Sequence, residues 1–178
     1  MDANPENILK MVAILGASVA MVTDMKWGKI YNWLTFPLII LGIALNSYFF
    51  GLKGFGTSLA ASTLGCGFYM GLAIIGAVGM GDVKLLGAIG ALGGIKFVLS
   101  VFLFSAVVGI PHSFLVQYLN YGRNAIPMLV TSFLTGAFKE KTIHSENKTE
   151  TLRFHYYLGV DILIGTVIAF IIEVPITF

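Results

Sequence analysis

Residues 54–95 read GFGTSLAASTLGCGFYMGLAIIGAVGMGDVKLLGAIGALGGI and carry only two charged side chains, Asp82 and Lys84. A helix that is apolar on all sides belongs in a protein interior or in a membrane. The rest of the chain is similar, because 57% of its 178 residues are apolar, 11% are charged and the mean hydropathy is +0.87. Soluble domains carry about 25% charged residues. The sequence therefore predicts an integral membrane protein.

Six charge-poor runs are candidate membrane spans, since a spanning helix needs about 20 apolar residues. We expect an all-α, polytopic fold with about six transmembrane helices and a single domain over residues 1–178. Pro111 predicts a kink in the fifth run. No small-residue cleavage site clearly follows the first run, so we expect it to be a retained span rather than a signal peptide. The runs are Ile8–Thr23, Leu34–Phe50, Ser58–Val78, Val83–Ile95, Phe97–Leu119 and Tyr157–Ile176.

A polar segment over about 120–155 is expected to be a cytoplasmic loop, in which Asn124–Phe138 rests on the membrane or continues the fifth span. With the N-terminus outside, eight Lys and Arg residues fall in cytoplasmic segments and three outside. This bias favours a multi-pass protein of the cytoplasmic membrane in that orientation. The net charge of +2 is too small and too dispersed to indicate a nucleic-acid partner.

The sequence does not contain the motifs that several common kinds of catalysis and ligand binding require. The single cysteine, Cys66, excludes an intrachain disulfide and a CxxC site. The sequence has no HExxH, GxSxG, Walker or GxGxxG motif. Its three histidines, His112, His144 and His155, are dispersed, and we expect structural or solvated roles for them. We expect neither a metal nor a cofactor.

Four acidic side chains lie within or at the ends of the spans, where an ionised aspartate costs of order 3 kcal/mol at mid-helix. Asp161 and Glu173, near the two ends of the sixth run, are expected to be interfacial. Asp24 ends the first run and Asp82 opens the fourth. Two spans separate this pair, and an even number returns the chain to the face it left. The two aspartates can therefore meet, whichever way the protein is inserted.

The setting of Asp82 is Gly79-Met80-Gly81-Asp82-Val83-Lys84. Glycines tolerate close backbone approach and unusual dihedrals, so this pair predicts room for an extended peptide beside the carboxylate. The alternative is that these glycines only pack helices together, as expected for Gly67-x-x-x-Gly71 and Gly90-x-x-x-Gly94.

Two carboxylates at a shielded site share a proton, as in aspartic proteases. One of them activates a water as general base, while its protonated partner polarises the scissile carbonyl and protonates the leaving amine. This scheme requires no covalent intermediate and no metal.

Two motifs together carry a family resemblance. Asp24 is followed by Met-Lys-Trp-Gly-Lys-Ile-Tyr-Asn-Trp-Leu-Thr, ending at Thr35, and Gly79–Leu85 reads GMGDVKL. This combination resembles the type IV prepilin peptidase family of GxGD membrane aspartyl proteases. With one cysteine and no paired CxxC motifs, the chain resembles the peptidase-only form, which lacks the methyltransferase part.

The resemblance implies an aspartic endopeptidase with Asp24 and Asp82 as catalytic residues, supported by Gly79, Gly81 and Lys84. Its substrate would be a prepilin-like protein, such as a pilin, pseudopilin or flagellin-like chain. Cleavage would occur at the cytoplasmic membrane face, between a short basic leader and an apolar helix. Two other hypotheses stay open: a small ion-coupled transporter whose acids bind cations or relay protons, and a non-catalytic component of pilus or secretion assembly.

Overall fold

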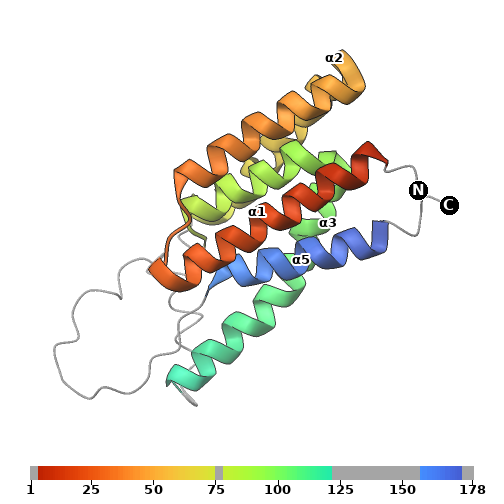
Figure 1. Cartoon of the computed structure of the whole chain (residues 1–178). Helices are drawn as coiled ribbons and strands as arrows, with labels where there is room; N and C mark the ends of the chain where they lie inside the picture. The colour runs from red at the N-terminus through yellow and green to blue at the C-terminus, as the bar shows by residue number, and fades with distance from the viewer. Residues whose placement is uncertain (1–3, 75–77, 122–156, 174–178) are drawn as a thin grey trace.

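The computed structural model describes residues 4–74, 78–121 and 157–173. Its helices are α1 (Pro5–Trp27), α2 (Asn32–Ile74), α3 (Met80–Tyr121) and α5 (Leu158–Glu173), and the described residues form no strand (Figure 1). The predicted all-α fold is confirmed. Three helices, α1, α2 and the part of α3 up to Val116, are long and apolar enough to cross a membrane.

Helices α2 and α3 each consist of two segments that meet at a glycine with left-handed φ. Gly51 has φ 61° and ψ −145°, and Gly94 has φ 81° and ψ −178°. L-residues with side chains rarely adopt these values, so glycine permits the chain to reverse here. Figure 1 shows the orange first segment of α2 leading to such a reversal. In α3 the non-helical dihedrals lie at Gly94, whereas the expected kink site, Pro111, stays within the helix.

The first segment of α3, residues 80–93, forms the centre of the bundle. Apolar side chains on every side of it are 2% exposed or less, as expected for a helix surrounded by other helices. Both segments of α2 pack against it closely. A Cβ at Gly42 would lie 2.8 Å from the Ala91 carbonyl carbon, and one at Gly65 would lie 2.6 Å from the Leu86 carbonyl oxygen. Small residues permit this approach between membrane helices.

The two glycine pairs that were expected to pack helices behave differently. Gly90 lies against the backbone of Ala61, as predicted, but Gly94 marks the reversal of α3 and makes no such contact with the described residues. Among the described residues, no atom lies within 4 Å of a Cβ added at Gly67, Gly71 or Gly94, so the prediction is wrong for these three. Gly67 and Gly71 are on the exposed side of α2, whereas Gly65 is buried. A spacing of four residues identifies a helix face but does not say whether that face meets another helix.

The carbonyls just before the reversal at Gly94 are satisfied by polar side chains of α2. Asn46 Nδ2 donates to the Ala91 oxygen at 2.9 Å and to the Leu92 oxygen at 3.2 Å. Ser58 Oγ also donates to the Ala91 oxygen, at 2.6 Å. Lipid offers no hydrogen bonds, so each unsatisfied carbonyl in a membrane costs several kcal/mol. These side chains therefore stabilise a break in the central helix.

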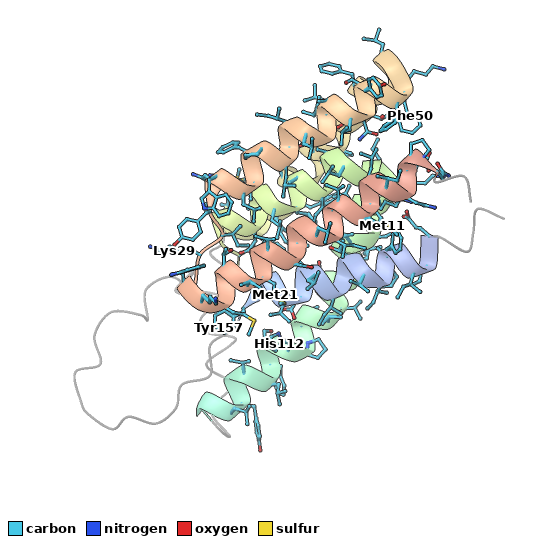
Figure 2. All side chains as sticks on the ribbon, viewed as in Figure 1. Met11, Met21, Lys29, Phe50, His112 and Tyr157 are labelled. Atoms are coloured by element: carbon cyan, nitrogen blue, oxygen red, sulfur yellow. The ribbon has the colours of Figure 1, made fainter. Side chains whose placement is uncertain are left out.

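The segments alternate in direction, and the bundle has two ends. Figure 2 labels Lys29, in the loop just before α2, and Phe50, at the end of the first α2 segment. At the end that contains both reversals, Lys10 Nζ of α1 lies 2.7 Å from Glu173 Oε2 of α5. Glu173 Oε1 also accepts from Ser100 Oγ at 3.3 Å. Glu173 was expected to be interfacial; in the structure it lies at this end of the bundle and joins α1, α5 and α3.

The helix boundaries differ from the expected runs in instructive ways. Helix α1 begins at Pro5 after the N-cap Asn4, and Gly28 in the left-handed conformation ends it, so it exceeds the apolar run on both sides. The fourth apolar run, Val83–Ile95, has only 13 residues. Helix α3 begins at Met80 and so includes the charged residues Asp82 and Lys84. The proposed interfacial piece 124–138 and residues 174–176 lie outside the described residues.

Close packing at Gly65 predicts a large difference between neighbouring glycines. In Gly65→Ala the new methyl group would meet the Leu86 backbone, and overpacking of this kind costs about 1–3 kcal/mol. Gly67→Ala is the matched control, because it adds the same atom to the same helix at an open position. Thermal unfolding in detergent should show a lower Tm for Gly65→Ala only. Equal Tm values for the two variants would contradict the packing described here.

Candidate active site

Asp24 lies in the last turn of α1, where the helix dipole disfavours a negative charge. Its side chain is partly buried. The Gly159 N–H, in the first turn of α5, donates to Asp24 Oδ2 at 3.1 Å. A Cβ at Gly159 would lie 3.0 Å from that oxygen, so glycine lets α5 approach the carboxylate. A donor from a distant part of the chain thus offsets an unfavourable local position.

Asp82 lies in the first turn of α3, where the helix dipole favours a carboxylate. The residue is 9% exposed. Its Oδ2 accepts a hydrogen bond from the Gly79 N–H at 3.2 Å. Its Oδ1 is buried and has no hydrogen-bond partner among the described residues. Such orphaned polar atoms are rare in folded proteins and often mark a place where another group binds.

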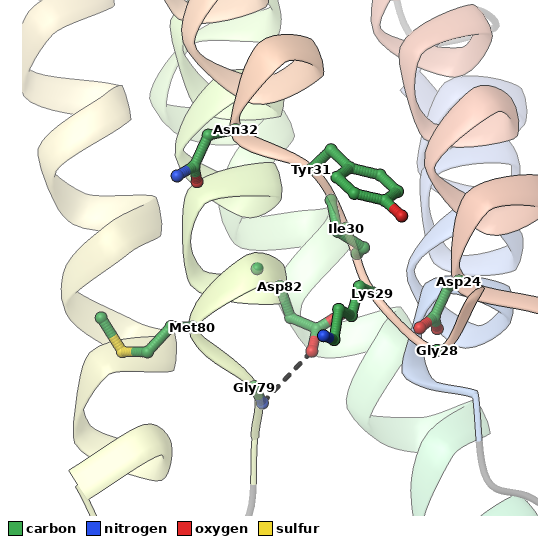
Figure 3. Close-up of a pocket in the computed structure, with 10 residues that line it drawn as sticks. Asp24, Gly28, Lys29, Ile30, Tyr31, Asn32, Gly79, Met80 and Asp82 are labelled. Atoms are coloured by element: carbon green, nitrogen blue, oxygen red, sulfur yellow. Dashed lines mark hydrogen bonds between the residues drawn. The ribbon is translucent and has the colours of Figure 1, made fainter.

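Asp24 and Asp82 line one pocket with a volume of about 350 Å³, shown in Figure 3. The carboxylates also interact electrostatically. The two aspartates lie at the same end of the bundle, as the count of helical passes predicts. The remaining lining residues come from the α1–α2 loop and the start of α3, and they are Gly28, Lys29, Ile30, Tyr31, Asn32, Gly79, Met80 and Gly81.

The two motif glycines have different surroundings. A Cβ at Gly81 would lie 2.9 Å from Ile30 Cβ and 3.2 Å from the Ile30 oxygen. A Cβ at Gly79 would lie 2.9 Å from Asp82 Oδ2. Room for an extended peptide was expected beside the Asp82 carboxylate, and the pocket lies there, but Ile30 of the protein's own loop fills the space directly next to Gly81. Gly81 therefore brings the loop against α3, and Gly79 brings a backbone donor to the carboxylate.

Lys84, the charged residue after Asp82, does not line the pocket. Its Nζ donates to Asn32 Oδ1 at 2.8 Å and lies 5.3 Å from the centre of the Phe36 ring. Asn32 is the first residue of α2 and directly follows the pocket-lining loop. Lys84 thus links the first residue of α2 to the N-terminal part of α3, outside the pocket lining.

Aromatic side chains stand at the start and end of the same loop. Trp27 and Tyr31 pack edge to face with ring centres 6.1 Å apart. Trp27 is 57% exposed. Trp and Tyr concentrate where membrane and water meet, because one part of each ring system is apolar and another forms hydrogen bonds. The pocket therefore lies at the end of the bundle whose composition suits a membrane interface.

Asp161 corrects an expectation drawn from the sequence. We expected an interfacial acid, but the residue is fully buried. Its Oδ1 lies 2.8 Å from His112 Nδ1 in the second segment of α3. The pair is far apart in the sequence, and no local motif announces it. The other histidines, His144 and His155, lie outside the described residues. In the part of the chain that the structure describes, no three His, Cys, Asp or Glu side chains form a group that could hold a metal.

Comparison with known proteins supplies a family for this arrangement. No curated protein and no solved structure matches the chain. The model of the type IV leader peptidase family matches residues 11–114. This region includes Asp24, Gly79, Gly81 and Asp82, together with all of the pocket lining. Because the match spans more than half of the sequence, the chain belongs to the type IV leader peptidase family.

Proposed function

We propose that this protein is an intramembrane aspartic endopeptidase that removes the short basic leader from prepilin-like substrates. The observation that carries the proposal is the single pocket lined by Asp24 and Asp82, two carboxylates from separate helices in a chain of a leader peptidase family. The proposed protein crosses the cytoplasmic membrane six times, with one crossing for each helical segment. The excess of Lys and Arg in the connections at the pocket end supports a cytoplasmic position for the site.

The proposed chemistry uses the two carboxylates with one proton between them. The ionised carboxylate takes a proton from a water molecule, whose oxygen attacks the scissile carbonyl carbon. The protonated carboxylate donates a hydrogen bond to the carbonyl oxygen as negative charge develops there. When the C–N bond breaks, a carboxyl proton passes to the leaving amine. The Gly159 amide holds one oxygen of Asp24 and the Gly79 amide holds one oxygen of Asp82, so each carboxylate is oriented by a backbone donor.

The proposed substrate fits the position of the pocket. A basic leader stays in water, an apolar helix stays in lipid, and their junction lies at the level where Trp27 and Tyr31 are found. Met80 lines the pocket and is 52% exposed, so it offers an adaptable apolar contact to the first residues of a substrate helix. Lys29, in the pocket lining, would repel a basic leader. Recognition should therefore rest on the substrate helix more than on the charge of the leader.

The dyad is tested by removing each carboxylate in turn. Asp24→Asn and Asp82→Asn should each lower cleavage of a peptide with a basic leader and an apolar helix by at least ~100-fold, since each variant lacks a proton-transfer group. Glu173→Gln is the control, because it changes an acid at the opposite end of the bundle. Cleavage should be measured with the purified proteins in lipid, after confirming that each variant is inserted.

Two outcomes would count against the proposal. Full cleavage by both aspartate variants would exclude the dyad. If the wild-type protein cleaves none of several such peptides, the transporter and assembly hypotheses become stronger, and cation flux in vesicles separates those two.

A substrate whose leader carries neutral residues in place of basic ones should still be cleaved at a similar rate, since its helix is unchanged.

The role of Lys84 can be tested separately from that of the dyad. Lys84→Met loses the charged hydrogen bond to Asn32, and cleavage should fall about fivefold because the pocket-lining loop is held less firmly. Lys96→Met, a change to an exposed lysine of the same helix at the far end, should have no effect. Asn32→Ala should match Lys84→Met, and the double variant should be no worse than either. Additive losses would show that the two residues act independently.

A further inference from the structure

The first turn of α5 is held on two sides. Gly159 contacts the end of α1, where its N–H bonds to Asp24 and a Cβ would lie 3.4 Å from Met21 Cα. Asp161, two residues later, contacts the second segment of α3 through His112. Residues two apart on a helix point to different sides, so these contacts do not compete. Figure 2 labels His112 on α3, near the start of α5.

The bond between Asp161 and His112 is buried on the side of the aspartate. The Asp161 side chain is 1% exposed and that of His112 is 30% exposed. Asp161 Oδ1 and His112 Nδ1 lie 2.8 Å apart, which is a hydrogen-bond distance. Burying a carboxylate is costly, and a partially satisfied one more so. Asp161 Oδ2 has no hydrogen-bond partner among the described residues. Because a buried carboxylate with one unsatisfied oxygen is costly, a gain in stability alone does not explain an aspartate at this position.

We propose that Asp161 is a positioning residue for the active site: by fixing the first turn of α5 to His112, it holds the Gly159 amide against the carboxylate of Asp24. This inference rests on the proposed function for its effect on catalysis. It extends the site to α5, which lies beyond the part of the chain that matches the family model. Asp161 touches neither the pocket nor the reacting atoms, and it acts through Gly159.

The hydrogen bond from the Gly159 amide to Asp24 is sensitive to the position of the first turn of α5. The first amides of a helix have no acceptor within that helix, so the hydrogen bond of the Gly159 N–H is the one to Asp24. A displacement of the turn by a fraction of an ångström lengthens a bond that is already 3.1 Å. Asp24 then loses the donor that orients its carboxylate. The chemical step should suffer, while substrate binding through the helix should not.

The experiment compares truncations at the two ends of α5 in the full-length protein in lipid. Asp161→Ala removes the bond to His112, and Glu173→Ala removes the ion pair to Lys10 at the far end. Both variants should lower the Tm. Only Asp161→Ala should lower kcat, by ~10-fold, with KM within about twofold of wild type. An equal loss of kcat in both variants would reduce Asp161 to a general stabiliser and overturn the proposal.

The variant Asp161→Asn distinguishes an effect of the hydrogen bond to His112 from an effect of the negative charge of Asp161. The carboxylate of Asp161 also interacts electrostatically with Asp82, so its charge alone is a rival cause of any effect. Asparagine keeps an oxygen that accepts from His112 but carries no charge. If position matters, Asp161→Asn should retain kcat within about threefold of wild type, because the hydrogen bond survives. A loss in Asp161→Asn as large as that in Asp161→Ala would assign the effect to charge and contradict positioning.

Hydrogen exchange of the Gly159 amide tests the inference without any substrate. In protein labelled with ¹⁵N-glycine, Asp161→Ala should speed exchange of this amide by ~10-fold, as local opening becomes easier, and Glu173→Ala should leave it unchanged. Asp24→Ala is the positive control, since it removes the acceptor. Unchanged exchange in Asp161→Ala would overturn the proposal even if the enzyme is active. Faster exchange in a protein that cleaves no substrate would reject the proposed function and keep the structural link.

Discussion

The reversal of α2 at Gly51 decides where everything else in this protein lies. It returns the chain to the end of the bundle at which α1 stops, and so brings Gly79 and Asp82 beside Asp24. The turn is tight, because a Cβ at Gly54 would overlap the Asn46 oxygen, so the two segments close only around a glycine. A second reversal at Gly94 sends the chain back once more. The pocket is a consequence of this path rather than of any single helix.

The polar side chains within the bundle serve two distinct purposes. Asn46 and Ser58 satisfy carbonyls at a helix break, and Lys10 pairs with Glu173 at the far end. These contacts remove the cost of polar groups in an apolar setting. The carboxylates at the pocket end do not fit this description. Asp82 has one oxygen without a hydrogen-bond partner in the described part of the chain, and Asp24 stands where a helix dipole opposes it. Departures from local preference of this kind concentrate at functional sites.

Much of this architecture could be predicted from the sequence, because it depends on the length of the apolar runs and on the positions of the charged residues between them. Long apolar runs indicated helices, and the even number of runs between Asp24 and Asp82 placed both at one end without knowledge of their structure. The helix ends could not be predicted in the same way. Charge-free runs exclude Asp82 and Lys84, yet both belong to α3, since a helix N-terminus accommodates an acid. Pro111 suggested a kink, whereas the break at Gly94 depends on polar partners from α2.

The contacts in and around the pocket could not be predicted from the sequence, because they join residues that no local pattern connects. Gly159 meets Asp24, Gly81 meets Ile30, and Asp161 meets His112 only after the helices have packed. An isolated aspartate near the end of an apolar run is usually interfacial, and nothing in the sequence around Asp161 distinguishes it from that case. Asp161 is recognised by its burial and by its partner His112 on a facing helix, and both are known only once the fold is known.

In the proposed function, two carboxylates held at one end of this bundle cut a peptide where its polar leader meets its apolar helix. The decisive measurement is mass spectrometry of the products from a prepilin-like peptide. We expect two fragments from a single cut at that junction, formed by the wild-type protein in lipid and absent when Asp24 and Asp82 are both replaced by asparagine. Cuts within the helix, or the same fragments from the double variant, would contradict the proposed function.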